Sequence, residues 1–459
     1  MRLDQVERIH FIGIGGAGMS AIAKVLLERG HTISGSDLKR SRAATILEAM
    51  GATISIGHRA EFLESAAPQV VVVSSAIPPS NVELRAAREA DLEVLTRGQA
   101  LAAILEGRRS IVVAGTHGKT TTTSMVVAIL RAAGVDPTYL VGGGLNDVGT
   151  NARSGRDDIA AAESDESDGS FLLLNPTIGV VTNVEPDHLD YWRSDAEMRE
   201  GFRQFIARTG VDGAVVVPAD DPALVEMARD NHGSVTTFGP GGTVFARDIH
   251  ILPTGTRFEI VRGHESAEVE LRVPGLHNVS NALAAAAGCL LVEVPLAAAA
   301  RGLSGFQGVE RRFQIRGRAG GVTVIDDYAH HPTEVRATLA AARPGPWERV
   351  VAVFQPHRYS RTQALFEDFG SAFDQADRVV VTDVYGAGEQ PVPGVSGKLV
   401  ADAVCTRLPG RPVAYLPHRS DLAGYLERTA RAGDALLTLG AGDISSLGEE
   451  ILERLEGPR

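Results

Sequence analysis

The residues best suited to chemistry lie in the stretch 111–123, where a short β-branched run leads into Gly115-Thr-His-Gly118-Lys119-Thr120. A glycine-punctuated turn before a helix offers backbone N–H groups to a phosphate, a lysine adds positive charge, and a hydroxyl suits Mg²⁺. The usual phosphate loop has a glycine five residues before Gly118, but Val113 stands there, so this loop is shorter. The stretch still predicts a nucleotide site, made of Gly115, Thr116, His117, Gly118, Lys119, Thr120 and Thr121.

A second glycine-rich turn, Gly13-Ile-Gly15-Gly16-Ala17-Gly18, follows a predicted strand near the N-terminus. A strand, this Gly-x-Gly-x-x-Gly pattern and a helix are together typical of dinucleotide binding, and Asp37 follows the next strand near the distance of a ribose contact. Because the same turn holds any diphosphate, two classes stay open: an NAD-dependent dehydrogenase and a protein that binds a nucleoside diphosphate sugar.

More polar residues follow the later predicted strands of this region, and loops after such strands form the ligand edge of the sheet. For His58, a solvated loop position is an equal alternative. The candidate contacts for uracil, ribose or diphosphate are Gly15, Gly16, Ala17, Gly18, Ser36, Asp37, His58, Ser74, Ser75 and Arg97.

Acidic residues cluster at 163–168, directly after a predicted strand. Mg²⁺ bound to a nucleotide is usually held by one or two carboxylates and by phosphate oxygens, so a carboxylate is expected here. Only Glu163, the first acid, is favoured, and most of the others are expected to face solvent or cap a helix. His188, in a polar cluster after the next strand, could hold a second metal ion. The glycines at 142–144 predict a flexible turn that a substrate can approach closely.

The second half of the chain adds polar residues at turns and strand ends. Asn278 has a donor and an acceptor that match an adenine edge, whereas Asn281 is expected to begin or cap a helix. Arg312 lies at a predicted domain boundary, from which an arginine can reach a phosphate. Two later loops suit an amino acid, because arginine binds a carboxylate with its fork, and they contain Asp327, Tyr328, His330, Arg358 and Arg361. An ordinary surface pair is the alternative for these two arginines.

The chain has 459 residues, 44% of them hydrophobic, and a net charge of −12. It is too long for one hydrophobic core, and its apolar runs without alternation predict strands covered on both faces. We expect an α/β fold of three domains, at 1–107, 108–312 and 313–459: a central P-loop ATPase domain with a mostly parallel sheet and a small antiparallel patch, between two Rossmann-like domains. The acidic charge argues against nucleic acid and anionic membranes. Two distant cysteines and the short apolar runs predict a cytoplasmic protein.

Taken in chain order, these motifs resemble the Mur ligases of peptidoglycan synthesis. The matching stretches are Gly13-Ile-Gly-Gly-Ala-Gly-Met19, Gly115-Thr-His-Gly-Lys-Thr-Thr121, Thr182-Asn-Val-Glu-Pro-Asp-His188, His277-Asn278, Arg311-Arg312-Phe313, Asp326-Asp-Tyr-Ala-His-His-Pro332 and Gln355-Pro-His-Arg-Tyr-Ser-Arg-Thr362. The resemblance covers essentially the whole chain and implies one domain each for a UDP-sugar, ATP and an amino acid. It also implies a ligase that activates the lactyl carboxylate of UDP-N-acetylmuramate as an acyl phosphate and joins it to L-alanine.

The resemblance also implies a role for each matching residue. Those implied in catalysis are Lys119, Arg312 and His330. One or two Mg²⁺ ions would be held by Thr120, Glu163 and His188. ATP would contact Asn278 through adenine, Arg312 through phosphate and Asp327 through ribose, and alanine would be oriented by Tyr328, His330, Arg358 and Arg361.

Three alternatives remain at this stage: a recycling ligase of the same family, the dehydrogenase and a non-catalytic nucleotide-binding module. Ligases of the family that add later residues carry a carbamoylated lysine, and no lysine stands at the matching place after His188, which favours the alanine-adding branch. The rival is a recycling ligase that attaches a preformed tripeptide to UDP-N-acetylmuramate. A monomer and a homodimer both stay open.

Overall fold

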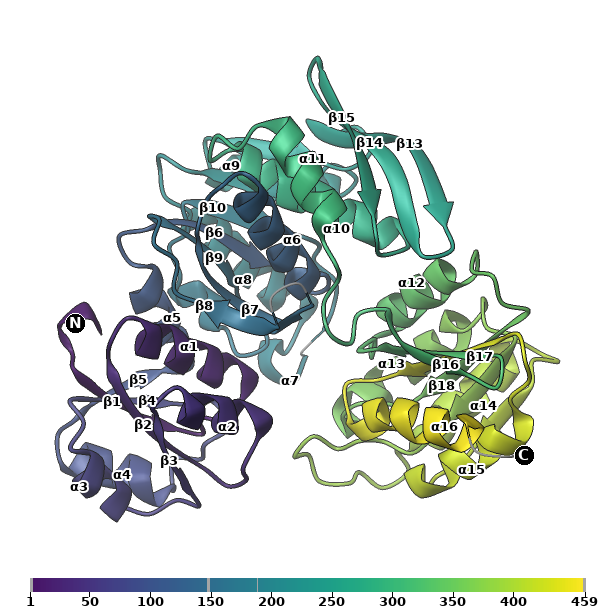
Figure 1. Ribbon diagram of the computed structural model, residues 1–459, viewed down its shortest axis with the longest axis horizontal. Coiled ribbons are helices and arrows are strands. Elements are labelled where there is room, and N and C mark those ends of the chain that lie inside the picture. Colours follow the sequence, from purple (N-terminus) through teal and green to yellow (C-terminus); the bar gives the residue numbers. More distant parts are fainter. Residues whose placement is uncertain (1–2, 147–148, 188, 457–459) are drawn as a thin grey trace. The chain divides into compact units, whose positions relative to one another are not determined.

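The structure, a computed structural model, describes residues 3–146, 149–187 and 189–456 (Figure 1). Contacts within the chain divide it into two compact units. The first comprises Met1–Ala246, Ile260–Ala267 and Asn281–Phe306, and the second comprises Arg247–Glu259, Glu268–Ser280 and Gln307–Arg459. Three sheets with flanking helices confirm the expected α/β class. The expected boundaries of three domains stay a prediction.

The N-terminal sheet has five parallel strands in the order β3-β2-β1-β4-β5. In this Rossmann-like order, ligands bind beyond the carboxyl ends of the strands, where the order reverses next to β1. The strands are β1 (Arg8–Ile12), β2 (Thr32–Asp37), β3 (Thr53–Ile56), β4 (Val70–Val73) and β5 (Glu93–Thr96). The helices are η1 (Leu3–Gln5), α1 (Ala17–Glu28), α2 (Arg42–Ala49), α3 (Glu61–Ala66), α4 (Val82–Glu89) and α5 (Arg97–Leu105).

The central sheet has ten strands in the order β15-β14-β13-β12-β11-β10-β6-β9-β7-β8. Strand β6, which carries the phosphate loop, runs parallel to both neighbours, β10 and β9. Because the carboxyl ends of parallel strands meet at one edge, the ends of β9 and β10 flank that loop. The strands are β6 (Arg109–Ala114), β7 (Thr138–Leu145), β8 (Thr150–Arg153), β9 (Ile159–Glu163), β10 (Ile178–Val181), β11 (Ala214–Pro218), β12 (Val235–Phe238), β13 (Val244–Leu252), β14 (Gly255–Arg262) and β15 (Glu265–Leu271).

The helices of this part are α6 (Lys119–Ala132), η2 (Ser170–Leu173), α7 (Leu189–Trp192), α8 (Asp195–Ala207), α9 (Pro222–Asn231), α10 (Leu276–Leu290) and α11 (Leu296–Gly305). Asn281 lies inside α10, so the expectation that it begins or caps a helix is wrong. Two-residue turns join β13 to β14 and β14 to β15, as in the antiparallel patch that the sequence predicts.

The three glycines at 142–144 belong to strand β7, so the expectation of a flexible turn is also wrong. The reason is a close contact at Gly142. A Cβ atom there would lie 2.6 Å from Glu163 Oε2, and the Gly142 amide donates to that same oxygen. Glycine in a strand often marks such a close approach.

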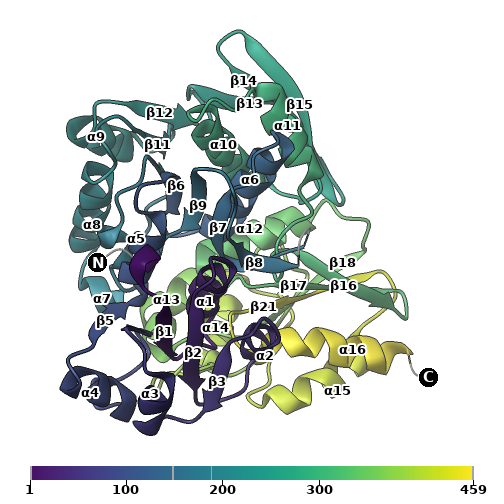
Figure 2. The same cartoon turned by 60° about the vertical axis from the view of Figure 1, so that its left-hand side comes forward.

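Helix α1 packs against strands β7 and β8 as well as against its own sheet (Figure 2). One hydrophobic core joins these parts: it contains Ile22 and Val25 of α1, Phe11 of β1, Leu140 of β7 and Ala152 of β8. The glycine-rich turn before α1 and the central sheet are therefore held together by shared packing within the first unit.

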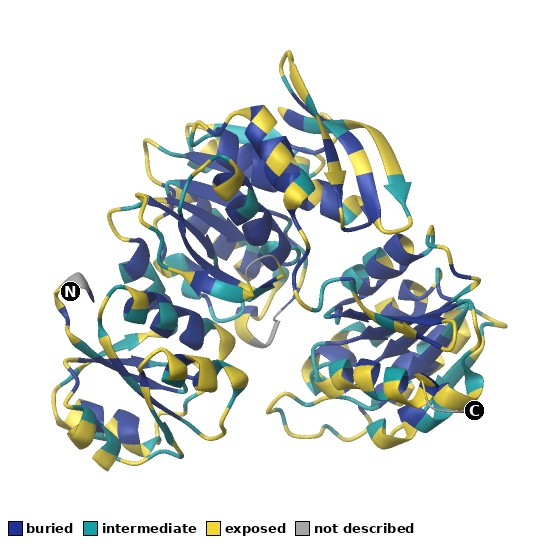
Figure 3. Cartoon of the chain, in the orientation of Figure 1, coloured by how far each residue is buried: buried dark blue, intermediate teal, exposed yellow. Residues whose placement is uncertain are grey.

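The C-terminal sheet has the order β16-β17-β21-β18-β19-β20, parallel except for β16 at its edge. Its central strands are buried on both faces, as their dark colour in Figure 3 shows, and a separate hydrophobic core covers each face. The strands are β16 (Gln314–Ala319), β17 (Val322–Asp327), β18 (Arg349–Phe354), β19 (Arg378–Val381), β20 (Val413–Tyr415) and β21 (Asp434–Leu439). The helices are α12 (Pro332–Ala342), α13 (Tyr359–Ala372), α14 (Gly397–Arg407), α15 (Arg419–Thr429), η3 (Asp443–Ser446) and α16 (Leu447–Glu456). Within the described ranges, none of the helices has the length and apolarity that a membrane span requires.

Candidate active site

The phosphate loop joins strand β6 to helix α6 and depends on two glycines. Gly115 and Gly118 have φ angles of 132° and 80°, a region that L side chains rarely adopt. A Cβ atom on Gly118 would also lie only 2.4 Å from Asn281 Oδ1. Gly118 is the N-cap of α6. A glycine N-cap has no side chain to bond the first amides of the helix, and such amides bind anions.

The end of strand β10 holds the loop in shape. Thr182 Oγ1 and Asn183 Nδ2 donate to the His117 carbonyl oxygen at 2.6 Å and 3.1 Å. Asn183 Oδ1 accepts from the His117 amide at 2.9 Å. Thr182 and Asn183 were not predicted to support the loop, although their position at the end of a strand beside β6 indicates such a role.

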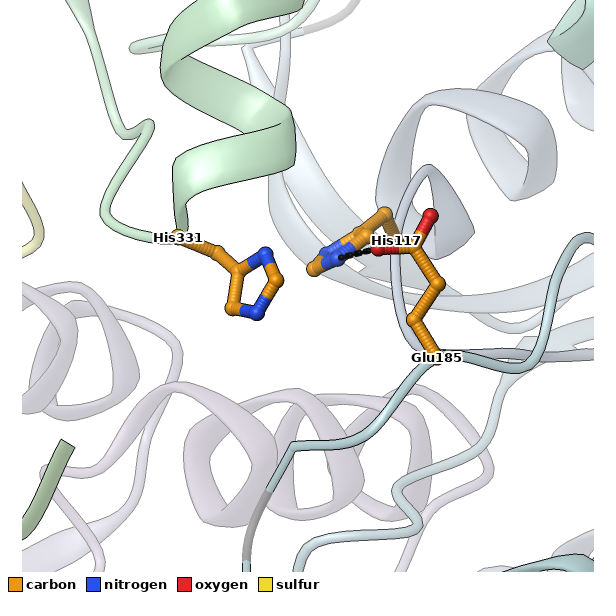
Figure 4. A group of neighbouring side chains, drawn as sticks. All are labelled: His117, Glu185 and His331. Carbon is orange, nitrogen blue, oxygen red and sulfur yellow. Dashed lines mark ion pairs between the residues drawn. The ribbon is translucent and has the colours of Figure 1, made fainter. Parts of the chain in front are cut away.

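The segment after β10 continues this support on the far side of the loop. Figure 4 shows the His117 ring beside Glu185, with Nε2 at 3.6 Å from the carboxylate Oε2. Thr116 Oγ1 donates to the Glu185 carbonyl oxygen at 3.1 Å and accepts from the Glu185 amide at 2.9 Å. The side chains of Thr116 and His117 thus anchor the loop to a neighbouring strand end.

Lys119 opens helix α6 and folds back over the loop. Its Nζ donates to Gly115 O at 2.6 Å, to Thr116 O at 3.1 Å and to Glu166 Oε1 at 2.8 Å. Burial alone would lower the pKa of Lys119, but the nearby carboxylates, led by Glu166, outweigh it and hold the pKa above its usual value. The lysine is therefore charged. Most of the acids after Glu163 are expected to face solvent or cap a helix, and Glu166 is an exception, because its side chain is 1% exposed.

Glu163 ends strand β9 beside the loop. Its Oε1 accepts from Thr120 Oγ1 at 2.9 Å, and its Oε2 accepts from the Gly142 amide at 2.7 Å. A hydroxyl and a carboxylate this close form a pair of hard oxygen donors, which suits Mg²⁺. The third expected metal ligand, His188, lies outside the described residues. Thr121, the last residue of the expected nucleotide set, is buried in the first turn of α6.

A cavity of about 240 Å³ connects the phosphate loop with the N-terminal glycine turn. Lys119 lines it from helix α6 and Glu163 from the end of strand β9, while Gly18 and Arg97 line it from helices α1 and α5. Phe171 and other apolar side chains complete the wall. A largely apolar cavity with a few convergent charged groups is the usual form of a small-molecule site.

The N-terminal glycine turn is shaped by Asp37. The Gly15 amide donates to Asp37 Oδ2 at 2.9 Å, and Ser41 Oγ donates to the Gly15 carbonyl oxygen at 3.3 Å. Gly16 is the N-cap of α1, followed by Ala17 as its first residue. The structure brings the glycines and Asp37 together as expected, and the ribose contact of Asp37 stays a prediction.

Arg97 lies against the third glycine of the turn. A Cβ atom on Gly18 would be 3.1 Å from Arg97 Cδ, so a larger residue there would displace the arginine by a few tenths of an ångström. Its Nη2 donates to Asp165 Oδ2 at 3.1 Å and to Asp168 Oδ2 at 2.8 Å. A guanidinium beside a helix N-terminus is a favourable place for a diphosphate. The serine loop after β4 also approaches this turn: a Cβ atom on Gly13 would lie 3.0 Å from Ser74 Cβ, and the neighbouring Ser75 is exposed.

Two other expected sugar-nucleotide contacts belong to a buried polar network centred on Glu83. Ser36 Oγ donates to Glu83 Oε2 at 2.6 Å and lies 3.0 Å from His58 Nδ1, while His10 Nε2 lies 3.2 Å from Glu83 Oε2. Burial alone would raise the pKa of Glu83, but hydrogen bonds from His10, Ser36 and the Arg59 amide outweigh it and hold the pKa below its usual value. Neither Glu83 nor His10 was predicted from the sequence. It had no signal for them, because a glutamate on an ordinary helix pattern is expected to be exposed.

In the second unit, Tyr328 follows strand β17 and contacts two arginines. The guanidinium carbons of Arg311 and Arg312 lie 4.9 Å and 5.2 Å from the centre of the ring, within cation–π range. Arg311 Nε donates to Asp326 Oδ2 at 3.2 Å, and Arg312 Nη1 lies 3.5 Å from Glu334 Oε1. Arg311 therefore fixes the tyrosine, a role that the sequence analysis did not assign.

His330 is held in one tautomer. Its Nδ1 lies 2.9 Å from the Tyr328 carbonyl oxygen and 3.2 Å from Glu334 Oε2. Because these oxygens accept, we assign the proton to Nδ1 and the lone pair to Nε2. Burial lowers the pKa of His330 to about 3, so the ring is neutral at physiological pH. A neutral imidazole with its lone pair on Nε2 can accept a hydrogen bond from an amine.

The protonation of His330 can be measured directly. In the folded protein we expect ¹⁵N chemical shifts of a neutral ring protonated on Nδ1, with no titration from pH 8 down to about pH 5. Below pH 6.5 His330 takes up a proton in the unfolded protein but not in the folded protein. Its contribution should therefore lower the free energy of unfolding progressively as the pH falls toward 3. The signal is assigned by its loss in His330→Asn. A midpoint between pH 6 and 7 would contradict this assignment.

Arg358 and Arg361 lie at the start of helix α13. Arg358, the N-cap, has φ 67° and ψ 138°, a conformation that costs a non-glycine residue about 1–3 kcal/mol. Arg361 is 8% exposed, and its Nη1 lies 3.3 Å from His357 Nδ1. Backbone strain of this kind concentrates at functional sites, so it favours a ligand role for this loop over an ordinary surface pair.

The two remaining expected nucleotide contacts are engaged with the backbone. Asp327 accepts from the Phe313 and Ala329 amides, both at 2.8 Å. Burial raises the pKa of Asp327 to about 6, against the opposing charge of Arg312. Asn278 Nδ2 donates to the Pro274 carbonyl oxygen at 2.7 Å. The adenine and ribose roles of these residues stay predictions.

The fold and these loops define a class of protein: an α/β nucleotide-binding protein whose phosphate loop and diphosphate-type glycine turn open onto one cavity. Three family models match the chain: "Mur ligase family, catalytic domain" at residues 8–109, "Mur ligase middle domain" at 113–289 and "Mur ligase, glutamate ligase domain" at 311–442. The chain belongs to the Mur ligase family.

Relatives and solved structures agree over nearly the full length. The chain is 50% identical to the UDP-N-acetylmuramate–L-alanine ligase of Rubrobacter xylanophilus, over 98% of this chain and 100% of the relative. It matches the crystal structure of the UDP-N-acetylmuramate–alanine ligase of Thermotoga maritima with a TM-score of 0.81 and 30% identity, covering 98% and 99% of the two chains. A murein peptide ligase from Psychrobacter arcticus matches with a TM-score of 0.73 and 26% identity, covering 98% and 99%.

Proposed function

We propose that this protein is an ADP-forming ligase that joins L-alanine to the lactyl carboxylate of UDP-N-acetylmuramate at the expense of ATP. The reaction supplies a precursor of peptidoglycan, and we place it in the cytoplasm. We assign the sugar nucleotide to residues 1–107, ATP to residues 108–312 and the amino acid to residues 313–459. The relatives that act on UDP-N-acetylmuramate and L-alanine support this choice of substrates.

One observation carries the proposal: Lys119 and Gly18 line the same cavity. A triphosphate held by the phosphate loop and a diphosphate held by the glycine turn would share that space. Their reacting ends, a γ-phosphate and the carboxylate of the sugar, would then meet without bulk water. Holding two reactants together in this way lowers the barrier of a bimolecular step.

In the first step, a carboxylate oxygen of the sugar nucleotide attacks the γ-phosphorus, and ADP leaves. Lys119 stabilises the negative charge on the phosphoryl group in transfer. Thr120 and Glu163, with His188 as a further candidate, would hold Mg²⁺, which supplies positive charge to the phosphate oxygens when bound. Asn278, Arg312 and Asp327 are proposed to hold adenine, phosphate and ribose.

In the second step, the amine of L-alanine attacks the carbonyl carbon of the acyl phosphate, and inorganic phosphate leaves after a tetrahedral intermediate. Arg358 and Arg361 are proposed to bind the alanine carboxylate, with Tyr328 beside it. His330 Nε2 would accept a hydrogen bond from the N–H of the amine. This bond would orient the lone pair of the amine nitrogen toward the carbonyl carbon. With a pKa of about 3 this ring is too weak a base to hold the proton, so we assign it an orienting role.

A direct comparison of amine donors tests the proposal. The protein is incubated with ATP, Mg²⁺ and UDP-N-acetylmuramate, together with either L-alanine or the preformed tripeptide. ADP is followed by a coupled assay and the product by mass. We expect turnover with L-alanine to exceed that with the tripeptide by at least about 100-fold, because a site that binds a free α-carboxylate is blocked by a longer substrate. Turnover with the tripeptide alone would assign the protein to the recycling ligases. Tight NADH binding without ATP hydrolysis would instead favour a dehydrogenase.

A further inference from the structure

The ammonium of Lys119 has no spare donor in the structure. An ammonium group has three N–H donors. Three acceptors use them: the carbonyl oxygens of Gly115 and Thr116 at 2.6 Å and 3.1 Å, and Glu166 Oε1 at 2.8 Å. A phosphate oxygen can therefore contact Lys119 only if one of these three partners gives way.

Glu166 is placed by its surroundings. Its side chain is 1% exposed, and its carbonyl oxygen accepts from Trp192 Nε1 at 3.0 Å. Trp192 is itself 5% exposed and packs edge-on against Phe171, with ring centres 6.0 Å apart. The Gly169 amide donates to the same carbonyl at 3.2 Å. Two hydrogen bonds thus hold the backbone of Glu166, and its carboxylate accepts from Lys119.

We propose that Glu166 is a positioning residue for nucleotide binding: its carboxylate holds the Lys119 ammonium at the phosphate loop, and the ammonium exchanges this carboxylate for a phosphate oxygen when ATP binds. This inference rests on the proposed ATP site. Glu166 does not touch the nucleotide. It acts through Lys119, by keeping the ammonium at the loop and by competing with the phosphate for it.

Two physical reasons support the exchange. A buried ammonium needs a counter-charge, and Glu166 is the first of the nearby carboxylates that hold the pKa of Lys119 above its usual value. Burial raises the pKa of Glu166 itself to about 7, against the opposing charge of Lys119, so its carboxylate is ionised above that pH. A triphosphate then brings several negative charges close to the same buried carboxylate, and like charges in a site of low dielectric repel strongly. Of the three partners of Lys119, the carboxylate is therefore the one that the nucleotide displaces.

The same acidic loop provides a matched control. Asp168 lies two residues after Glu166, but its carboxylate accepts from Arg97 Nη2 at 2.8 Å instead of from Lys119. Glu166→Gln and Asp168→Asn both replace a carboxylate by an amide of the same shape. Only the first removes a charged competitor from Lys119.

The test is the dissociation constant of ATP with Mg²⁺, measured by calorimetry without the sugar nucleotide at about pH 8.5, where Glu166, with its pKa of about 7, is ionised. We expect Glu166→Gln to bind ATP about tenfold more tightly than the unchanged protein, because a neutral partner is easier to displace. Asp168→Asn should stay within about twofold. Damage to the loop weakens binding, so tighter binding cannot come from a merely structural role. Unchanged or weaker ATP binding by Glu166→Gln would overturn the exchange.

A second measurement uses the protein without any substitution at Glu166, so it does not depend on the stability of a variant. With both tryptophans replaced by 5-fluorotryptophan, we expect ATP to shift the ¹⁹F resonance of Trp192, which bonds to Glu166, and to leave that of Trp347. A Trp192 resonance that ATP leaves in place would contradict the exchange. If the unchanged protein binds no ATP at all, the proposed function fails. If it binds ATP and ligates alanine while Glu166→Gln binds no more tightly, only this inference fails.

Discussion

Replacing Lys119 by alanine is expected to remove ligation and ATP-dependent ADP release almost completely, by at least about 10³-fold in kcat. The loss follows from the position of the ammonium, which is charged, buried and bonded to the loop carbonyls of Gly115 and Thr116. No other lysine stands in residues 111–123. Steady-state ADP release with saturating L-alanine and UDP-N-acetylmuramate measures the effect.

This substitution also disturbs the fold, and a double variant separates the two effects. Without Lys119, the 1% exposed carboxylate of Glu166 loses its cation, which costs up to about 3–5 kcal/mol of folding free energy while the group stays ionised. Burial raises the pKa of Glu166 to about 7, so this cost is largest above that pH. Lys119→Ala combined with Glu166→Gln removes the stranded charge. We expect the double variant to recover most of the melting temperature and none of the activity. Recovery of a tenth or more of the activity would mean that Lys119 serves the fold and not the phosphoryl transfer.

The fold was predictable where the apolar pattern of a short segment shows whether that segment is a strand buried inside a sheet. The run at 111–114 has no polar alternation, so it had to be a strand covered on both faces, and β6 lies in the middle of the central sheet. The same argument held for the valines of β4 at 70–73. Glu163 could be placed beside the loop for a related reason, because parallel strands bring their carboxyl ends to one edge.

The missed residues depend on contacts between segments that are far apart in the sequence. Glu166 stands 47 positions from Lys119, and Asn183 stands 66 positions from His117. No spacing rule indicates which of four neighbouring acids will turn inward. The glycines at 142–144 failed differently. Their composition is typical of a turn, but the approach of a carboxylate, not chain reversal, is what requires a glycine at Gly142.

Backbone strain was likewise invisible to sequence patterns. The loop with Arg358 and Arg361 was predicted from residue types alone, and an ordinary surface pair was an open alternative. The φ of 67° at Arg358 and the burial of Arg361 are properties of the folded chain, set by the strand β18 and helix α13 on either side. They favour the ligand role, whereas the residue types could not decide it.

His330→Ala is expected to stop amide formation while acyl phosphate is still made. The lone pair at Nε2 would be lost, and with it the orientation of the amine, so we expect kcat for ligation to fall by about 10²–10³-fold. The first step needs Lys119 and not His330, so the acyl phosphate can be trapped with hydroxylamine at a yield close to that of the unchanged protein. The exposed His418 in the same unit provides a control. His418→Ala should change neither kcat for ligation nor the yield of trapped acyl phosphate.

A second substitution at His330 distinguishes the lone pair from support of the loop. In His330→Asn, the side-chain amide can still donate to the Tyr328 carbonyl oxygen, as Nδ1 does at 2.9 Å, but no atom stands at the place of Nε2. If Nε2 orients the amine, the asparagine variant ligates as slowly as the alanine variant. If the bond to Tyr328 is what matters, asparagine restores ligation, and His330 then belongs to the support of Tyr328 and not to the second step. Burial already keeps this ring neutral. If His330 only orients the amine, raising the pH above 8 should restore ligation in neither variant. If His330 served to remove a proton from the ammonium, the higher pH would raise the ligation rate of both.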